Sequence, residues 1–223
     1  MGAHISAQTL QDQRLNMVNG QLRAGGIVDQ AVLAAFLETP RERFVAPAFV
    51  SLAYLDRELP ALGAKARRLL PPMTLARMLQ AAMVNPGERA LDVGGGSGYG
   101  AALLDSMGAK VVALESDAGA AAAARAELKG RANIVVIEGP LDKGAGELGP
   151  FDLIVMEGAF QVCPDGLISL LADPGRLVGI DASSGASQAV LCEKTGGALG
   201  RRALFETRAD PLDGFQPGVR FVF

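Results

Sequence analysis

The sequence predicts an α/β protein with a mostly parallel sheet, an antiparallel sheet edge and a helical N-terminal extension. From residue 89 onward, short β-type runs alternate with helical stretches, which implies right-handed crossovers and a sheet covered on both faces. The last apolar runs follow one another without helices between them, which favours antiparallel pairing at one edge. A chain of 223 residues, 49% of them hydrophobic, can bury a sizeable core.

The N-terminal part is predicted to be helical and then irregular. Apolar residues recur at helical spacing over residues 5–23, and Gly25 and Gly26 end that helix. Asp29 is placed to cap a second helix over 31–37, before Thr39-Pro40 stops it. Residues 44–70 contain scattered prolines and a basic cluster, so they are expected to form a long loop.

The alternating region begins with a helix at Pro72 that stops at Asn85-Pro86-Gly87. Four strands and two helices follow, and the last crossover, residues 138–149, lacks a clear helix. The expected strands are 89–93, 110–114, 133–137 and 152–156, and the expected helices are 99–107 and 117–129.

The C-terminal part is expected to form a helix over 164–171 and then strands at 176–180, 189–193, 199–207 and 219–223. No internal repeat or low-complexity linker demands a second full domain. The prediction is therefore one domain over 1–223, with residues 1–72 as the extension and 73–223 as the core.

The composition restricts the kinds of binding partner to be expected. The net charge is −3, so no large cationic field is expected to hold nucleic acid or an anionic membrane surface. The chain lacks an apolar run of about 18 residues and a secretory signal. Cys163 and Cys192 form no CxxC motif, which argues against a disulfide scaffold or zinc site, and no metal is expected. A small molecule or peptide partner in a reducing cytosol fits best.

The most informative stretch runs from Asp92 to Tyr99, where a predicted strand passes directly into a predicted helix. Gly94 and Gly96 permit positive φ and close backbone approach, while Gly98 is expected to let the helix start pack tightly on the strand. Such a turn in a Rossmann-like domain leaves bare backbone against which a nucleotide-type ligand can lie.

Two cofactor types compete for this turn. Dinucleotide sites usually read GxGxxG, whereas here the spacing is GxGxG, at Gly94, Gly96 and Gly98. Asp92 repels a pyrophosphate but suits the ammonium of S-adenosyl-L-methionine. Glu115 ends the next strand about 20 residues past the first glycine, where it can accept both ribose hydroxyl hydrogens.

S-adenosyl-L-methionine is therefore the predicted cofactor. The plainer alternative is that the glycines only form a tight turn and that Glu115 neighbours a helix N-cap. The predicted cofactor-binding residues are Asp92, Gly94, Gly95, Gly96, Ser97, Gly98, Glu115, Ser116, Glu138 and Gly139.

Together with further matches, these residues make the sequence resemble the protein-L-isoaspartate O-methyltransferases from about Gln21 to about Val178. The N-terminal matches are Gln21-Leu22-Arg23, Gly26-Ile27, Asp29, Val32-Leu33, Pro40-Arg41-Glu42, Phe44-Val45, Ala53-Tyr54, Asp56 and Leu59-Pro60. The later matches are Asp92 to Leu103, Glu115, Phe151 to Ile154 and, as in a bacterial subgroup, Gly214-Phe215 and Phe221-Val222-Phe223.

The resemblance implies a Rossmann-like methyltransferase fold and transfer of the sulfonium methyl group to the α-carboxylate of an isoaspartyl residue in damaged protein. The implied partner is thus a peptide or protein with isoaspartyl residues. A carboxylate is already nucleophilic, so the main task is alignment rather than base catalysis. This agrees with a chain whose one histidine is His4, near its start.

Two places depart from the family's pattern. The family's Gln-Thr-Ile-Ser-Gln-Pro segment is here Arg67-Arg68-Leu69-Leu70-Pro71-Pro72, so its serine position holds Leu70, which cannot hydrogen-bond through its side chain. No catalytic residue is therefore assigned. The family's Gly-Asp-Gly reads Gly139-Pro140-Leu141, which removes an adenine-contacting carboxylate that Glu138 or Asp142 would have to replace.

Several side chains keep two interpretations. Arg67 and Arg68 either clamp a substrate carboxylate or form a solvated basic loop. Glu157 either faces the cofactor or is a surface carboxylate at a strand end, and Cys163 is most simply a packing residue.

Three functional hypotheses follow. The first is an S-adenosylmethionine-dependent methyltransferase that acts on isoaspartyl sites for protein repair. The second keeps the cofactor but changes the acceptor, because Leu70 and Leu141 make the pocket more apolar. The third is a non-catalytic protein that keeps the cofactor fold for partner interaction. A nicotinamide dehydrogenase is a distant alternative.

Overall fold

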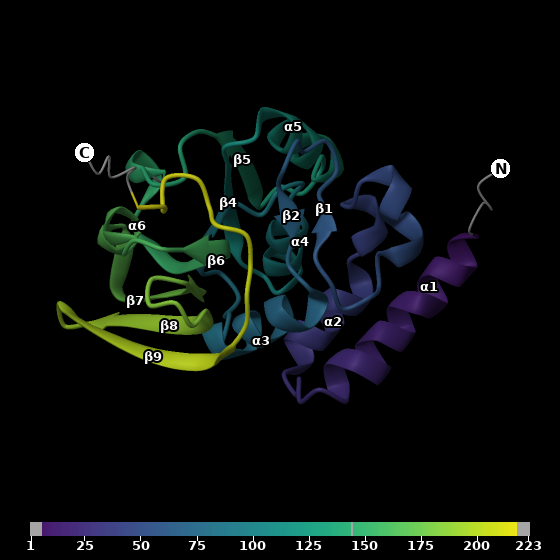
Figure 1. Cartoon of the computed structure of the whole chain (residues 1–223), viewed down its shortest axis with the longest axis horizontal. Coiled ribbons are helices and arrows are strands. Elements are labelled where there is room, and N and C mark those ends of the chain that lie inside the picture. Colours follow the sequence, from purple (N-terminus) through teal and green to yellow (C-terminus); the bar gives the residue numbers. More distant parts are fainter. Residues whose placement is uncertain (1–5, 144, 218–223) are drawn as a thin grey trace.

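The computed structural model describes residues 6–143 and 145–217 (Figure 1). Its main sheet has seven strands in the order β5-β4-β3-β6-β7-β8-β9. The first five are parallel, and β8 and β9 are antiparallel at one edge, as predicted. The strands are β3 (Arg89–Val93), β4 (Lys110–Glu115), β5 (Ile134–Glu138), β6 (Phe151–Phe160), β7 (Leu171–Asp181), β8 (Gln188–Thr195) and β9 (Ala198–Glu206). The strand predicted over 219–223 lies outside the described residues.

The helices of the alternating region are α3 (Pro72–Ala82), α4 (Tyr99–Ser106), α5 (Ala118–Glu127) and α6 (Asp165–Ser169). Asp117 caps α5, because its side chain accepts hydrogen bonds from the backbone N–H groups of Gly119 and Ala120, at 2.9 and 3.0 Å. Among the described residues of the crossover at 138–149, the helical element is the 3₁₀ turn Gly146–Leu148, in line with the missing helical pattern.

The N-terminal helix differs from the prediction in its second half. The α-helix α1 (Ala7–Asn16) continues as a π-helical stretch, Met17–Arg23. Met17 and Leu22, five residues apart, are both buried, and the wider i→i+5 turn suits that spacing. The helix α2 (Gln30–Glu38) follows, capped by Asp29 as expected.

Residues 44–70 are more ordered than the predicted long loop. They contain the 3₁₀ segment Pro47–Leu52 and an antiparallel hairpin of β1 (Leu59–Pro60) and β2 (Arg68–Leu69). Phe44, Leu59 and Leu70 are buried within this region. The prediction failed because these scattered apolar residues lack a period and become ordered only by packing on the rest of the chain.

Apolar side chains form two clusters on opposite faces of the sheet. Along β6, Leu153 and Val155 pack in the cluster that includes the N-terminal helices, whereas Ile154 and Met156 pack in the cluster that contains Leu212. Helices α3 and α4 therefore cover one face, while the other is covered partly by the segment after β9 that crosses in front of β6 (Figure 1). Within residues 6–143 and 145–217, no helix combines the length and apolarity that a membrane crossing requires.

Candidate functional site

The Gly-rich turn lies between β3 and α4, at the carboxyl end of the parallel strands. Gly94, Gly96 and Gly98 have φ values of +72°, +65° and +90°, so the conformation expected at the first two is confirmed. A Cβ atom at Gly98 would lie 2.6 Å from Leu128 Cδ1. The bare Cα of Gly98 thus makes room for Leu128, the residue after α5, and α4 itself packs on β3 and β4.

Asp92 and Ser97 are buried beneath this turn. The Asp92 carboxylate lies against Gly95, where a Cβ atom would be 2.5 Å from Oδ2. The Ser97 hydroxyl donates to the carbonyl of Phe44 at 2.5 Å, so it ties the turn to the N-terminal region. Of these two predicted site residues, Asp92 keeps a free acidic group and Ser97 is engaged by the fold.

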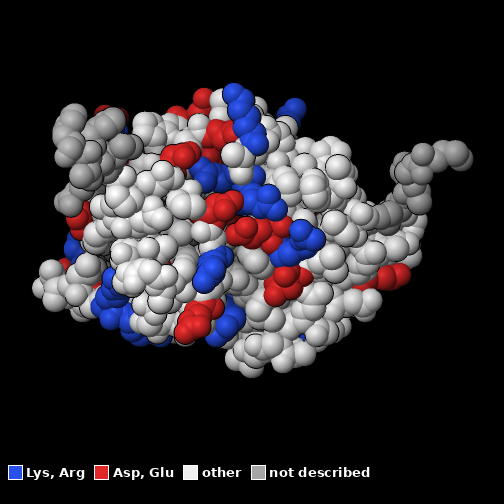
Figure 2. Space-filling view, in the orientation of Figure 1, with Lys and Arg blue, Asp and Glu red and all other residues white. Residues whose placement is uncertain are grey.

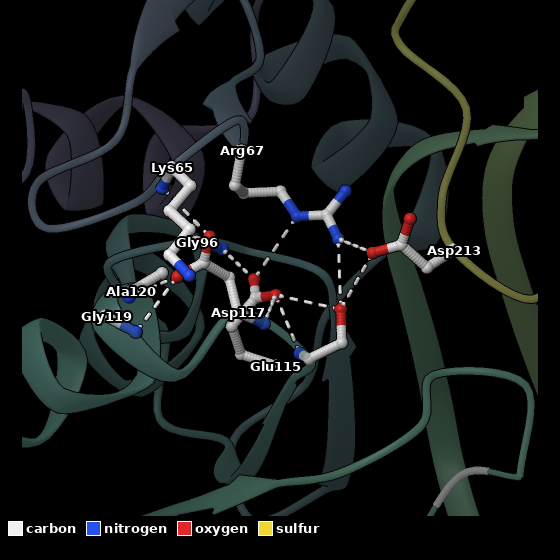
Figure 3. Close-up of polar contacts among 9 residues, drawn as sticks. Lys65, Arg67, Gly96, Glu115, Asp117, Gly119, Ala120 and Asp213 are labelled. Carbon is white, nitrogen blue, oxygen red and sulfur yellow. Dashed lines mark hydrogen bonds and ion pairs between the residues drawn. The ribbon is translucent and has the colours of Figure 1, made fainter.

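Glu115 at the end of β4 organises the polar cluster shown in Figure 3. Its Oε2 accepts a hydrogen bond from the Gly96 N–H at 2.8 Å, which joins the two predicted parts of the site directly. Its Oε1 accepts from the backbone N–H groups of Ser116 and Asp117, at 2.7 and 2.9 Å. The carboxylate, only 3% exposed, is thus fixed in place by three backbone donors.

Arg67 completes this cluster from the β1–β2 hairpin (Figure 3). Its Nε lies 3.5 Å from Glu115 Oε2, and its Nη2 lies 3.2 Å from Asp213 Oδ2 and 3.3 Å from Ser116 Oγ. The side chain is 9% exposed, so the interpretation as a solvated basic loop is wrong for Arg67. Arg68 differs, because it is 36% exposed and pairs with Glu58 at 3.6 Å.

The Ser116 hydroxyl also donates to Glu115 Oε1, at 3.4 Å. Arg67 Nε faces Glu115 Oε2 at ion-pair distance but makes no hydrogen bond to it. Glu115 therefore connects the Gly-rich turn and the start of α5 through hydrogen bonds, and the hairpin through charge.

Glu157 lies near the end of β6 and is 2% exposed, so its interpretation as a surface carboxylate is wrong. Its Oε1 lies against α4, where a Cβ atom at Gly100 would be 1.5 Å away. Burial raises the pKa of Glu157 to about 7 and also raises the pKa of Asp92, which Glu157 raises further. The two carboxyl groups lie within hydrogen-bonding reach of each other, and no side-chain donor from another described residue bonds to either of them.

A cavity of 260 Å³ opens beside these groups. Glu157 forms part of its inner wall, Leu70 and Arg68 come from the β2 region, and Asp210 and Asp213 come from the segment after β9. Leu70 is 1% exposed, and its carbonyl accepts a bond from Arg41 Nη2 at 2.9 Å. The predicted apolar residue at the family's serine position therefore does reach the cavity wall.

The C-terminal segment, defined here as residues 207–217, closes the other side of the site. The Ala159 N–H donates to the Asp210 carbonyl at 3.0 Å, and the Leu212 N–H donates to the Ala159 carbonyl at 2.8 Å. The buried Leu212 side chain lies over Gly94, where a Cβ atom would be 2.6 Å from its Cδ2. Sequence reasoning missed Leu212 and Asp213, because the neighbouring Gly214-Phe215 was the signal it used.

The remaining predicted residues lie at the edges of the site. The Glu138 side chain is 44% exposed and pairs with Arg125 at 3.5 Å, while the Gly139 N–H donates to the Glu115 carbonyl at 3.0 Å. Leu141 is buried against Gly94, as part of the second apolar cluster.

Two further residues from the sequence analysis are Cys163 and His4. Cys163 is exposed, so its interpretation as a packing residue is wrong, and partial burial and Asp165 raise its pKa to about 11. His4 lies outside the described residues.

Figure 2 shows that acidic and basic side chains alternate across the middle of this face of the molecule and do not form separate charged patches.

A parallel sheet with a GxGxG turn after one strand, and an acidic residue that ends the next, defines the class of Rossmann-like methyltransferases. The chain belongs to the protein-L-isoaspartate(D-aspartate) O-methyltransferase family, whose model matches residues 13–208.

Relatives and solved structures agree with this assignment. A protein-L-isoaspartate O-methyltransferase of Koribacter versatilis is 40% identical over 207 residues, which cover 91% of this chain and 91% of the relative. One of Gloeobacter violaceus is 37% identical over 204 residues, which cover 90% of this chain and 98% of the relative.

Among solved structures, a protein-L-isoaspartate O-methyltransferase matches with a TM-score of 0.80 at 25% identity, over 90% of this chain and 66% of that one. A putative family member from Plasmodium falciparum, described in complex with S-adenosyl-L-homocysteine, has the same fold, with a TM-score of 0.79 at 22% identity over 90% of this chain and 98% of that one.

Proposed function

We propose that this chain is an S-adenosyl-L-methionine-dependent methyltransferase that methylates the carboxylate of isoaspartyl residues in damaged protein. The observation that supports it most is the hydrogen bond from the Gly96 N–H to Glu115. It connects the Gly-rich turn with the acidic residue of the next strand, at the carboxyl ends of β3 and β4. Family membership supplies the reaction and the acceptor.

The residues present suit this cofactor. Asp92 and Glu157 are neighbouring buried carboxyl groups to which no other described side chain donates a hydrogen bond, and this favours a ligand with a positive end. The bound cofactor supplies an electrophilic methyl group on a sulfonium. We propose that the turn Gly94–Gly98 and Glu115 hold its adenosine end, and that Gly139 and Glu138 border it.

The chain's task toward the acceptor is to hold a carboxylate in line with the methyl group and to exclude water. Leu70 and Pro211 form apolar parts of the cavity wall, and the buried Leu212 packs beside it over Gly94. Arg67 and Arg68 line the same cavity and are its basic groups, beside the acidic side chains of Glu58, Asp117, Glu157, Asp210 and Asp213. No general base is required, because the carboxylate reacts in its ionised form.

The same cavity also supports a second class of methyl acceptor. Both of its arginines are already ion-paired, Arg67 with Glu115 and Asp213, and Arg68 with Glu58. Leu70 offers no hydrogen bond to an acceptor carboxylate. A methyltransferase with a less acidic acceptor is therefore the second candidate.

The proposed partner is a peptide or protein rather than nucleic acid, in keeping with the net charge of −3. We place the chain in a reducing cytosol, because both cysteines are free.

Transfer of labelled methyl from S-adenosylmethionine to an isoaspartyl peptide tests the proposal, with the matched aspartyl peptide as the specificity control. We expect transfer to the isoaspartyl peptide alone. Glu115→Gln should lower kcat/KM by about tenfold or more, since it replaces an ionised acceptor of hydrogen bonds with an amide. Glu193→Gln, an exposed carboxylate on β8, is the matched control.

The outcomes separate the hypotheses. Transfer to other peptides or small acids, with none to the isoaspartyl peptide, would favour the second acceptor class. Cofactor binding without transfer to any acceptor would favour the non-catalytic homologue.

A further inference from the structure

The paired carboxyl groups of Asp92 and Glu157 are not explained by alignment of the acceptor. They come from adjacent parallel strands, β3 and β6, and both are at least 98% buried on the same face of the sheet. Two bare Cα atoms make room for them, because a Cβ atom at Gly95 would lie 2.5 Å from Asp92 Oδ2 and one at Gly100 would lie 1.5 Å from Glu157 Oε1. The turn and the first residues of α4 are thus shaped around two acids.

In the described part of the chain, no Lys or Arg side chain forms an ion pair with Asp92 or Glu157. Arg41 is the buried cation whose charge reaches Glu157, yet it donates to the Leu70 carbonyl and lies over the Tyr99 ring at 5.1 Å. Among the described residues, Arg41 forms no ion pair with either acid, and its Nε and Nη1 are buried without a hydrogen-bond partner. A buried carboxylate without a partner is costly, so this pair requires a proton or a bound cation.

Glu157 also connects the pair to the place where a ligand enters. It lies on the wall of the 260 Å³ cavity, and Leu212 packs on its neighbour Gly158, where a Cβ atom would be 2.6 Å from Leu212 Cδ2. Of the two acids, Glu157 is therefore the one that borders the cavity.

We propose that Glu157 is a cofactor-binding residue that, together with Asp92, binds the primary ammonium at the methionine end of S-adenosylmethionine. This inference rests on the proposed function and adds a binding residue to it. An ammonium has three donors and a full charge, so it satisfies both acids at once. In the unliganded protein the pair holds a proton in its place, in keeping with the raised pKa of Glu157.

Calorimetry with two ligands tests this pairing. S-adenosylhomocysteine carries the ammonium, whereas 5′-methylthioadenosine has the same adenosine and lacks the amino-acid end. In Glu157→Gln we expect the affinity for S-adenosylhomocysteine to fall by about tenfold or more, because a charge-assisted bond is lost, while the affinity for methylthioadenosine stays within about twofold. Retained methylthioadenosine binding shows that the variant folds, and Glu193→Gln should change neither affinity.

Proton exchange gives a second readout that needs no variant. The charged and titratable groups facing Glu157 are Asp92 on β3, Glu115 on β4, Arg41, and Tyr99 on α4. At pH 6, binding of S-adenosylhomocysteine should release about one proton, measured from heats in buffers of different ionisation enthalpy, and binding of methylthioadenosine should release none.

Equal weakening of both ligands in Glu157→Gln, unchanged affinity for both, or no proton release by the original chain would overturn the inference while leaving cofactor binding intact. Binding of neither ligand by the original chain would overturn the proposed function as well.

Discussion

Burial sets the ionisation of single residues in this site. Glu157 and Asp92 are fully buried beside each other, and the first cause of their raised pKa values is desolvation. Glu115, equally buried, is instead surrounded by backbone donors and Arg67. Three carboxyl groups at neighbouring strand ends therefore have two different environments, and the difference comes from which donors reach them.

The pH dependence of stability should report the buried acid. The folded-state pKa of Glu157, about 7, is above its ordinary value of 4.5, so the folded chain loses stability relative to the unfolded chain as pH rises between these values. Glu157→Gln lacks this loss. Its unfolding free energy minus that of the original chain should rise by on the order of 3 kcal/mol from pH 4.5 to 8, in denaturant titrations. A constant difference across that range would contradict the assigned environment.

Glycine at position 100 should be required by its neighbour. Gly100→Ala places a Cβ atom 1.5 Å from Glu157 Oε1, so α4 or the carboxylate has to shift. We expect the free energy of unfolding to fall by about 1–3 kcal/mol. Gly20→Ala is the control, because nothing lies within 4 Å of a Cβ atom there, and it should be neutral or slightly stabilising.

At the scale of elements, the start of α5 connects the cofactor region to the β1–β2 hairpin. Asp117 caps α5 and also accepts a bond from the Lys65 N–H at 2.9 Å (Figure 3). Burial acts to raise the pKa of Asp117, but the backbone donors Lys65, Ala120 and Gly119 outweigh it and lower the pKa. One side chain thus fixes both a helix start and the loop that carries Arg67.

Removal of this cap should weaken both elements. Asp117→Ala should lower the free energy of unfolding by about 1–2 kcal/mol at pH 7. Because the folded-state pKa is lowered, the loss should shrink as pH falls below the ordinary value of 3.8. Chemical denaturation of Glu147→Ala, an exposed acid in a 3₁₀ turn, provides the comparison, and equal effects of the two changes would argue against a capping role.

At the scale of the whole molecule, the site is closed by segments far apart in the sequence. The hairpin reaches it through Arg67 and the C-terminal segment through Asp213, and the two side chains form an ion pair at 3.2 Å across the end of the sheet (Figure 3). Leu212 then fills the space against Gly94 and Gly158. The closed face is therefore built from the β1–β2 hairpin and the C-terminal segment, which lie about 140 residues apart in the sequence.

The C-terminal segment should contribute to global stability through Leu212. Truncation in Leu212→Ala removes a fully buried side chain from the second apolar cluster and should cost about 2–4 kcal/mol. Leu199→Ala, with a side chain 47% exposed on β9, should cost much less. Thermal unfolding of both variants measures this, and similar losses would show that the segment is not packed as described.

Much of the core could be predicted because its signals are local. The strand at 89–93, the positive φ of Gly94 and Gly96 and the cap at Asp29 each depend on a few adjacent residues. The environments of Arg67 and Glu157 could not be predicted in this way, because each is set by partners more than 40 residues away in the sequence.

The sequence by itself determined the α/β class, the Gly-rich turn, Glu115 as its acidic companion, and the replacement of the family's serine by Leu70, because residue type and spacing fix these locally. Only the tertiary structure decided that Arg67 contacts Glu115, that Leu212 covers Gly94, and that Asp92 and Glu157 form a buried pair. The physical reason is that burial and charge pairing arise where distant segments meet, and no local pattern records such a meeting.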